Sequence, residues 1–363
     1  MNILYVSHLV VEAESGPTWS VPASIKAQSK IDNVLWVNTS DGVMPNWEEL
    51  ECFLWLRNKP LKLNNIPAPF NKPDIVVFEA LYDSFQEITF SRELMRNKIP
   101  YVIIPRGSLT YMAMHNKSRW KKEIAHFLFY DNYIQKAAAI QYLTKREYED
   151  SKYRFDGPHF IIPNGFTLPI KVKEQFEGDS INAVFIGRFD IYHKGLDFII
   201  EVCNKQHKLL WENKFVVSLY GTKTKDWYLL KEQIDNLGMN NLIKLYGPVT
   251  GKEKENVLLN SDLFIMTSRF EGHPMGLIEA LAYGLPVIAS RGTNMYEEIE
   301  GSDAGWVCEP DMESIENAIL TMIDEKNKLM EKGKNARNLS EKYDWDLLAM
   351  RFHQEVKALV NKE

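Results

Sequence analysis

The chain has 363 residues, of which 45% are hydrophobic and 25% charged, and its formal net charge is -6. This length favours two domains of ordinary size, and the composition excludes a disordered or low-complexity chain. A net negative charge argues against a general nucleic-acid binder.

Residues 1–11 carry no basic segment and become polar at Ser7 and His8, which is typical of an opening strand and not of a signal peptide. No uninterrupted apolar run is long enough to cross a bilayer. The cysteines are far apart in the sequence, among apolar neighbours and without metal-ligand spacing: Cys52, Cys203 and Cys308. We therefore expect reduced thiols and a cytoplasmic location.

The first half of the chain alternates apolar strands with helices. Residues 3–6 form the first predicted strand, and His8 follows it at the edge where ligands gather in open parallel sheets. A loop over residues 14–20 contains Gly16, and a helix is expected over residues 22–30. Further strands are predicted over residues 34–37, 74–78, 101–104, 139–143 and 160–162, with another helix over 145–153.

A Pro-Arg-Gly-Ser turn follows the predicted strand over residues 101–104. Arg106 and Gly107 therefore lie at the edge where ligands gather, and the family resemblance carried by residues 268–290 implies that they are candidates for an acceptor or sugar pocket. The alternative for Arg106 is a structural ion pair within its own domain.

The segment 118–130 reads as a basic amphipathic helix. One face of this helix would carry the apolar residues Trp120, Ile124, Phe127 and Leu128. The basic residues 119, 121 and 122 would lie outside that face. Such a helix could make a peripheral contact with an anionic membrane surface, or it could pack against its own domain.

The second half of the chain repeats the pattern of the first. Residues 167–180 are charged and without a clear period, which indicates a linker. Strands are then predicted over residues 182–186, 215–219, 242–245, 263–267 and 286–289, and an amphipathic helix over 345–359. This alternation predicts an α/β fold with two Rossmann-like β/α/β domains, over residues 1–168 and 181–343.

A Gly-Arg turn and a Lys-Gly pair follow the strand over residues 182–186. They contain Gly187, Arg188, Lys194 and Gly195. Arginine offers a planar fork to phosphate oxygens, and lysine offers a mobile point charge. A basic pair alone would indicate nothing, and its interpretation depends on the segment over residues 268–290.

That segment predicts a strand, a loop, a helix and a strand, with Glu271 in the loop and Glu279 in the helix. In a continuous helix these carboxylates would lie about 12 Å apart along the axis, too far for a paired acid and base, so we expect them to hold two parts of one ligand. Gly272 and Gly276 permit close backbone approach, and Pro274 suits the helix entry, whose free N–H groups can bind an anion. Gly284 with Pro286 predicts the end of this helix.

The segment resembles the signature of the family 4 retaining glycosyltransferases, whose GT-B architecture has two Rossmann-like domains facing a cleft. The resemblance implies that Glu279 holds the ribose hydroxyls of a sugar nucleotide, while Arg188 and Lys194 contact its diphosphate. It implies that Glu271 and the backbone after it hold the transferred sugar. The implied donor-binding set is Gly16, Gly187, Arg188, Lys194, Gly247, Glu271, Gly272, His273, Pro274, Met275, Gly276, Leu277 and Glu279. The helix within residues 344–363 is then expected to pack back on the first domain.

The implied reaction transfers a sugar from a nucleotide-diphosphate sugar to a hydroxyl of a carbohydrate or lipid-linked acceptor, with retention, in cell-surface polysaccharide or glycolipid biosynthesis. The first domain would bind the acceptor. No Asp-x-Asp box precedes the glutamates, so we expect no metal and no cofactor, with cations serving instead. Catalytic candidates are Glu271, Arg188, Lys194 and His8. Two alternatives are a sugar-nucleotide epimerase and a catalytically silent subunit of a polysaccharide assembly complex.

Overall fold

The computed structural model describes residues 1–10, 16–57, 59–82, 84–115, 124–153, 155–176 and 178–361. Contacts divide the chain into unit 1, Met1–Gly165 with Trp345–Glu363, and unit 2, Phe166–Asp344. The charged segment expected to be a linker packs on unit 2, because Lys173 forms an ion pair with Asp262 at 3.0 Å. Its side chains therefore belong to the surface of that unit.

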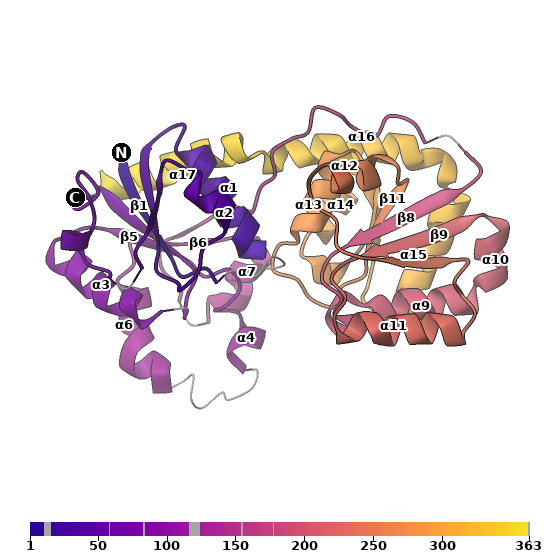
Figure 1. Ribbon diagram of the computed structural model, residues 1–363, viewed down its shortest axis with the longest axis horizontal. Coiled ribbons are helices and arrows are strands. Elements are labelled where there is room, and N and C mark those ends of the chain that lie inside the picture. Colours follow the sequence, from indigo (N-terminus) through magenta and orange to yellow (C-terminus); the bar gives the residue numbers. More distant parts are fainter. Residues whose placement is uncertain are drawn as a thin grey trace. The chain divides into compact units, whose positions relative to one another are not determined.

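Unit 1 contains a seven-stranded parallel sheet in the order β3-β2-β1-β4-β5-β6-β7 (Figure 1). The strands are β1 (Asn2–Ser7), β2 (Asn33–Asn38), β3 (Phe53–Trp55), β4 (Ile75–Glu79), β5 (Tyr101–Ile104), β6 (Ala139–Tyr142) and β7 (His159–Ile161). The sequence did not predict β3, which has three half-buried residues at one edge of the sheet. A strand this short and incompletely buried has little periodic signal.

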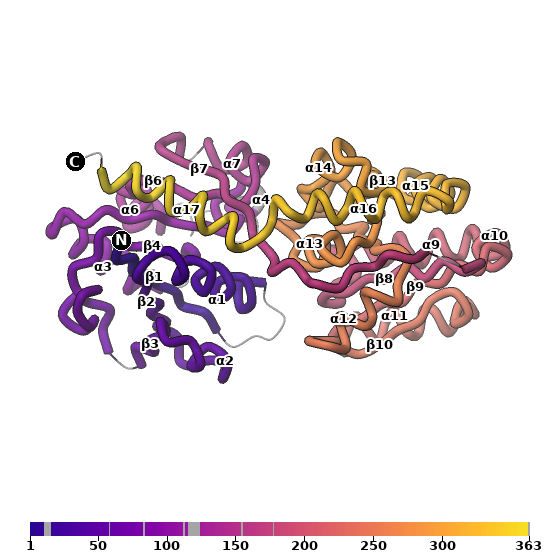
Figure 2. The backbone as a smooth tube through the Cα atoms, turned by 90° about the horizontal axis from the view of Figure 1, so that it is seen from above, coloured from indigo at the N-terminus to yellow at the C-terminus, as the bar shows by residue number. Residues whose placement is uncertain are grey.

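Alternate residues of β1 enter two different cores, as expected for a sheet covered on both faces. Ile3 and Tyr5 pack with α1 and α17, whereas Leu4 and Val6 pack with α3 and α6. The helices of unit 1 are α1 (Gly16–Gln28), α2 (Pro45–Glu48), η1 (Leu63–Asn65), α3 (Phe85–Arg96), α4 (Tyr111–His115), η2 (His126–Tyr130), α6 (Asp131–Gln135), α7 (Lys145–Ser151) and α17 (Trp345–Val360). Figure 2 shows α17, from the far end of the chain, among the N-terminal elements.

The first helix begins earlier than the sequence predicted. A start at Pro22 was expected, but α1 begins at Gly16 and contains Pro22 in its interior. A proline inside a helix removes one backbone hydrogen bond. Val21 and Ile25 are fully buried on either side of it, so tertiary packing outweighs the local preference.

Unit 2 contains a six-stranded parallel sheet in the order β10-β9-β8-β11-β12-β13. The strands are β8 (Ile181–Ile186), β9 (Phe215–Tyr220), β10 (Ile243–Tyr246), β11 (Leu263–Met266), β12 (Val287–Ser290) and β13 (Gly305–Cys308). The sequence did not predict β13, another edge strand. The two Rossmann-like β/α/β sheets confirm the predicted fold class.

Helices cover both faces of this second sheet (Figure 1). They are α8 (Ile191–Lys194), α9 (Leu196–Lys205), α10 (His207–Glu212), α11 (Lys225–Asn236), α12 (Gly251–Leu259), α13 (Met275–Ala282), η3 (Arg291–Thr293), α14 (Tyr296–Gly301), α15 (Met312–Asp324), η4 (Lys326–Lys328), α16 (Leu329–Ser340) and η5 (Glu341–Tyr343).

The strand order of unit 2 decides where the basic turn over residues 187–195 and the loop that contains Glu271 meet. The chain runs outward from β8 to β10, and then returns to place β11 on the other side of β8. Ligands bind parallel sheets at such a switch point, beyond the carboxyl ends of the strands. The turn over residues 187–195 follows β8, and the loop over residues 267–274 follows β11. The topology therefore brings together two segments that are about 80 residues apart.

Candidate active site

The turn after β8 and the loop after β11 are in direct backbone contact at Gly195. Gly195 has a φ of 63°, and a Cβ atom there would lie 2.1 Å from the carbonyl oxygen of Thr267. The hydroxyl of Thr267 donates a hydrogen bond of 2.9 Å to the carbonyl of Gly195. Only glycine meets both conditions without a shift of the backbone, so this residue fixes the position of Lys194 beside the loop.

Glu271 is the centre of the site. Its Oε1 accepts hydrogen bonds from Lys194 Nζ at 2.6 Å and from Ser268 Oγ at 2.7 Å. The Glu271 side chain is only 9% exposed. Asn294 Nδ2 also donates to the carbonyl oxygens of Glu271 and Gly272, which holds the loop backbone. The carboxylate is thus fixed in place before any ligand arrives.

His193 lies on the other side of this carboxylate. Its ring stacks on Phe270, with centroids 4.2 Å apart and planes 15° apart. His193 Nε2 lies 4.0 Å from Glu271 Oε2, and Nδ1 lies 3.8 Å from Asp190 Oδ2. Burial lowers the pKa of His193 below its ordinary value, although the Glu271 charge acts in the opposite direction. The sequence did not single out this residue.

Helix α13 begins where the sequence predicted, directly after Pro274. A Cβ atom on Gly276 would lie 3.0 Å from the carbonyl oxygen of Ile186, so glycine lets the first turn approach the end of β8. Leu277 is fully buried in the core, and only its backbone can face a ligand. Gly284 ends the helix with a φ of 78°, as its sequence position predicted.

Glu279 is neutralised by Lys254, a residue that the sequence analysis missed. Lys254 Nζ on α12 donates to Glu279 Oε2 on α13. The two side chains are 23% and 16% exposed, respectively. No spacing rule links them, because they are 25 positions apart on different helices. The structure thus gives each of the two signature glutamates its own lysine.

Lys194 forms an ion pair with Glu271, whereas the nearest carboxylate to Arg188 in the ion pairs of the described residues is Asp190. The guanidinium of Arg188 is 53% exposed and lies 3.8 Å from Asp190. The backbone before it is closely packed, because a Cβ atom on Gly221 would lie 2.1 Å from the carbonyl oxygen of Gly187. The turn is therefore rigid at Gly187, whereas the arginine side chain is solvated.

Other members of the predicted donor-binding set lie at the margins of the site. His273 is buried beside Tyr343, with ring centroids 5.5 Å apart, and burial lowers its pKa to about 3. Its imidazole is therefore neutral at ordinary pH. Gly247 and Gly272 have open space where a Cβ atom would lie, so neither is required by local packing. Met275 is the first residue of α13.

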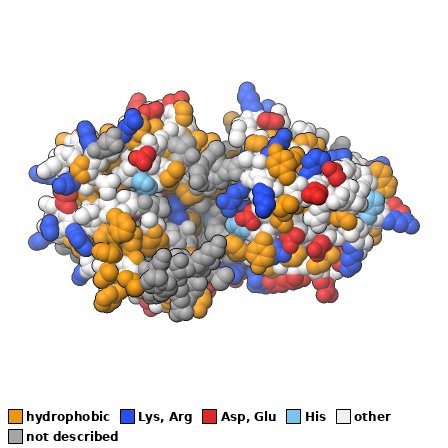
Figure 3. Space-filling view, turned by 60° about the horizontal axis from the view of Figure 1, so that its bottom comes forward, with side chains coloured by type: hydrophobic (Ala, Val, Ile, Leu, Met, Phe, Trp, Pro, Cys, Tyr) orange, Lys and Arg blue, Asp and Glu red, His pale blue; other side chains and the backbone are white. Residues whose placement is uncertain are grey.

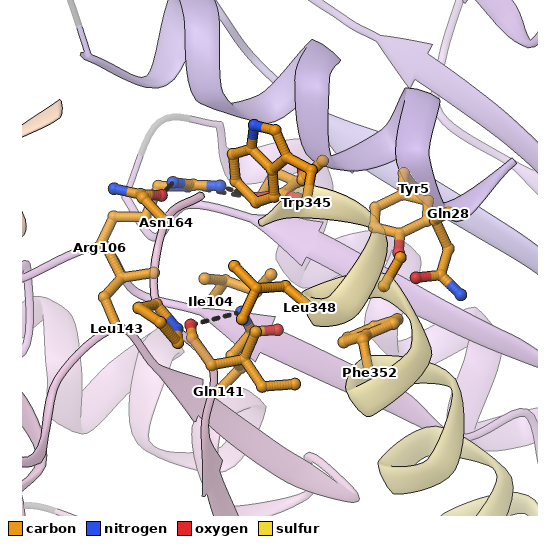
Figure 4. Close-up of a pocket in the computed structure, with 15 residues that line it drawn as sticks. Tyr5, Gln28, Ile104, Arg106, Gln141, Leu143, Asn164, Trp345, Leu348 and Phe352 are labelled. Carbon is orange, nitrogen blue, oxygen red and sulfur yellow. Dashed lines mark hydrogen bonds and ion pairs between the residues drawn. The ribbon is translucent and has the colours of Figure 1, made fainter. Parts of the chain in front are cut away.

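In unit 1, Arg106 forms the ion pair that the sequence left open as an alternative. Its guanidinium donates to Glu79 Oε2 at 2.7 and 3.1 Å, and to Asn164 Oδ1 at 3.1 Å. Figure 4 shows Arg106 and Asn164 on the wall of a cavity of about 30 Å³, with Trp345 and Leu348 of α17 opposite. That volume holds one or two water molecules and is too small for a sugar ring.

The remaining predicted residues of unit 1 lie at the carboxyl edge of its sheet. His8 follows β1, and its Nδ1 lies 3.0 Å from Thr39 Oγ1. Gly107 has a φ of 85°, and its N–H donates to Glu147. Gly16 is the first residue of α1.

The described residues contain no group of three or more His, Cys, Asp and Glu side chains able to hold a metal ion. Within the same ranges, no helix combines the length and the apolar character that a membrane span requires. The three cysteines, all described, are free thiols.

Residues 168–339, nearly the whole of unit 2, match the family model described as Glycosyl transferases group 1. The chain has the fold of the GT-B glycosyltransferases. A crystal structure of Anabaena Alr3699/HepE in complex with UDP superposes with a TM-score of 0.79, covering 99% of this chain and 100% of that chain at 16% identity.

Two curated relatives each align with just under two thirds of this chain. An uncharacterized 41.2 kDa protein in the cps region of Klebsiella pneumoniae is 24% identical over 250 residues, which is 65% of either chain. The capsular polysaccharide biosynthesis glycosyltransferase CapH of Staphylococcus aureus is 27% identical over 237 residues, 64% of this chain and 61% of its own length. The chain thus spans less than two thirds of each.

Proposed function

We propose that the protein is a metal-independent, retaining glycosyltransferase of family 4. It moves a sugar from a nucleotide-diphosphate sugar to a hydroxyl of a carbohydrate or lipid-linked acceptor, in cell-surface polysaccharide or glycolipid biosynthesis. The observation that carries the proposal is the cluster of Lys194, Ser268 and Glu271 at the switch point of a sheet within the matched family domain.

In this proposal, electrostatics supply most of the catalysis. Breaking the glycosidic bond places negative charge on the leaving diphosphate. Gly195 holds the backbone of Lys194 against the loop after β11, and Gly276 brings the first turn of α13 against the end of β8, so the backbone need not reorganise when that charge develops. Arg188, which is solvated in the free protein, closes on the phosphates as a second cation.

The signature glutamates are assigned to the two sugars of the donor. Glu279 accepts hydrogen bonds from the ribose hydroxyls, and Glu271 accepts them from the transferred sugar. In the free protein a lysine holds each carboxylate in place, Lys254 at Glu279 and Lys194 at Glu271. The proposal uses no protein nucleophile, and His8 assists only through its place at the end of β1.

An apolar surface of unit 1 supports a peripheral membrane contact as part of the proposal. The exposed fractions are 67% for Phe85, 51% for Ile124, 82% for Phe127, 55% for Leu128 and 41% for Phe129. Figure 3 shows hydrophobic side chains gathered on unit 1. Contiguous exposed apolar side chains mark an interaction site more often than a free surface.

This exposure bears on the predicted amphipathic segment 118–130. If this segment packed against its own domain, Phe127 and Leu128 would be buried. Both side chains are exposed instead. Trp120 and the basic residues 119, 121 and 122 lie outside the described residues.

The proposed function is tested by thermal melting of the full chain against a panel of nucleoside diphosphates and their sugars, with UDP first. A ligand that binds the folded state should raise the melting temperature in proportion to the logarithm of its concentration over its dissociation constant. Transfer to a hydroxyl acceptor, followed by anomeric analysis of the product by NMR, then tests retention. Binding without turnover would indicate a silent subunit, and conversion of the donor without an acceptor would indicate an epimerase.

A further inference from the structure

A buried nitrogen faces Oε2 of Glu271, to which no side chain or backbone group of the described residues donates a hydrogen bond. Lys194 and Ser268 both contact Oε1, whereas Oε2 faces His193 Nε2 at 4.0 Å. His193 Nε2 is fully buried and has no hydrogen-bond partner among the described residues. Buried polar atoms normally have a partner, so an atom left without one needs an explanation.

A diphosphate would compete with Glu271 for the ammonium of Lys194. Lys194 is 14% exposed and Glu271 is 9% exposed, so neither side chain has free access to solvent. If Lys194 turns toward a ligand, the buried carboxylate loses its counterion, and an unpaired buried charge is strongly unfavourable. Another cation must therefore take its place for Glu271 to stay ionised.

His193 is placed to be that cation. Its stacking on Phe270 at 4.2 Å holds the ring with Nε2 directed at Glu271. A movement of about 1.2 Å would bring the two atoms to the distance of a charge-assisted hydrogen bond. The charged groups around the ring are Asp190 at Nδ1, Glu271 at Nε2 and the neighbouring Lys194.

These neighbours favour a neutral His193 without a ligand and a protonated one with a ligand. In the free protein, burial and Lys194 both oppose protonation of the ring. When a diphosphate draws Lys194 away from Glu271, one opposing charge recedes and the carboxylate faces the ring alone. The ligand also adds negative charge to the site, which favours the imidazolium further.

We propose that binding of a nucleoside diphosphate moves Lys194 from Glu271 to the ligand, and that His193 takes one proton from solvent and replaces Lys194 as the partner of Glu271. The inference rests on the proposed function and adds a residue to it. No bond other than those of the transferred proton is formed or broken. His193 acts through Glu271 and is therefore a positioning residue.

The exchange is tested by isothermal titration of the full chain with UDP at pH 7 in two buffers of different ionisation enthalpy. The wild-type protein should take up a fraction of a proton, up to one, for each UDP bound. His193→Gln should lose this uptake, and His207→Gln, on α10, should keep it. Any proton released by UDP itself is common to all three proteins and cancels in the comparison. Uridine, which has no phosphate, should cause no uptake.

A second measurement does not depend on a variant folding. The imidazole NMR signals of His193 in the wild-type protein should titrate at higher pH with UDP than without. Equal uptake in His193→Gln and the wild type, or an unchanged titration of His193, overturns the exchange. Failure of the wild type to bind any nucleotide of the panel instead overturns the proposed function.

Discussion

The ammonium of Lys194 lies 2.6 Å from Glu271 Oε1, which joins two residues that are 77 positions apart. The pair is largely buried. Each member is therefore the counterion of the other until a ligand arrives.

Glu271→Ala and Lys194→Ala should each reduce sugar transfer by about a hundredfold or more, because the transition state loses a preorganised charge. Each should also lower the melting temperature, because its partner remains buried and unpaired. Lys205→Ala is the matched control, since Lys205 forms an ion pair with Glu316 of the same 2.6 Å length in the same unit. Full transfer activity in either site variant would refute the assignment.

Lys254→Met should weaken nucleotide binding by about tenfold or more, because a hydrogen bond from a charged group contributes roughly 1.5–3 kcal/mol. Lys252→Met, on the exposed side of the same helix, should bind UDP as the wild type does. Calorimetry at pH 7 measures the UDP affinities, and equal affinities for all three proteins would contradict a role for Lys254.

Arg106→Met should destabilise the protein by about 3–5 kcal/mol, because it leaves the carboxylate of Glu79 buried without a partner. Arg106 and Glu79 are 9% and 1% exposed, respectively. Lys30→Met, which removes a pair with Asp346 in which both side chains are 59% exposed, should cost about 1 kcal/mol or less. Denaturant unfolding measures the difference. A loss of acceptor binding at unchanged stability would instead support the pocket role of Arg106.

Acid should weaken the protein partly through His273. Burial lowers its pKa to about 3, whereas the unfolded chain has a pKa of about 6.5. Below pH 6.5 the imidazole is protonated in the unfolded state but not in the folded state. The free energy of unfolding therefore falls as the pH is lowered, by up to about 1.4 kcal/mol per pH unit.

His273→Gln removes this group, and its unfolding free energy should fall less between pH 6.5 and 4.5 than that of the wild type. His207→Gln is the control, because it replaces a histidine elsewhere in the same unit. Parallel curves for the wild type and His273→Gln would show that the buried imidazole does not contribute.

Phe127→Ser should weaken sedimentation with vesicles that contain anionic lipid. Phe127 is 82% exposed and is the most exposed side chain of the apolar surface of unit 1 described above. Tyr228→Ser, at a 60% exposed residue of unit 2, is the control and should bind as the wild type does. If the wild type does not sediment with vesicles at all, the membrane contact is wrong, and the transfer reaction is unaffected by that result.

Much of the architecture could be predicted from local patterns. Short apolar runs predicted the central strands of both sheets, since these strands are buried on both faces. Edge strands β3 and β13 were missed because they are only partly buried. The start of α1 was misplaced because local proline preference suggested Pro22, whereas buried packing around that residue carries the helix back to Gly16.

The candidate site was predicted where glycines and charges occur close together in the chain. Such segments singled out Glu271, Glu279, Arg188 and Lys194, and the family resemblance gave these residues their expected roles. Lys254 and His193 were not, because their roles depend on contacts between different elements: α12 with α13, and the turn after β8 with the loop after β11.

The two repeated α/β patterns, the glycine turns and the charged residues beside them can be recognised in the amino-acid sequence, because they depend on neighbours along the chain. Which charges meet depends on how the strands and helices pack. Arg106 joins Glu79 inside unit 1, Lys194 joins Glu271, and Arg188 stays in solvent. Ion pairing depends on distance in space and on burial, and sheet order sets both.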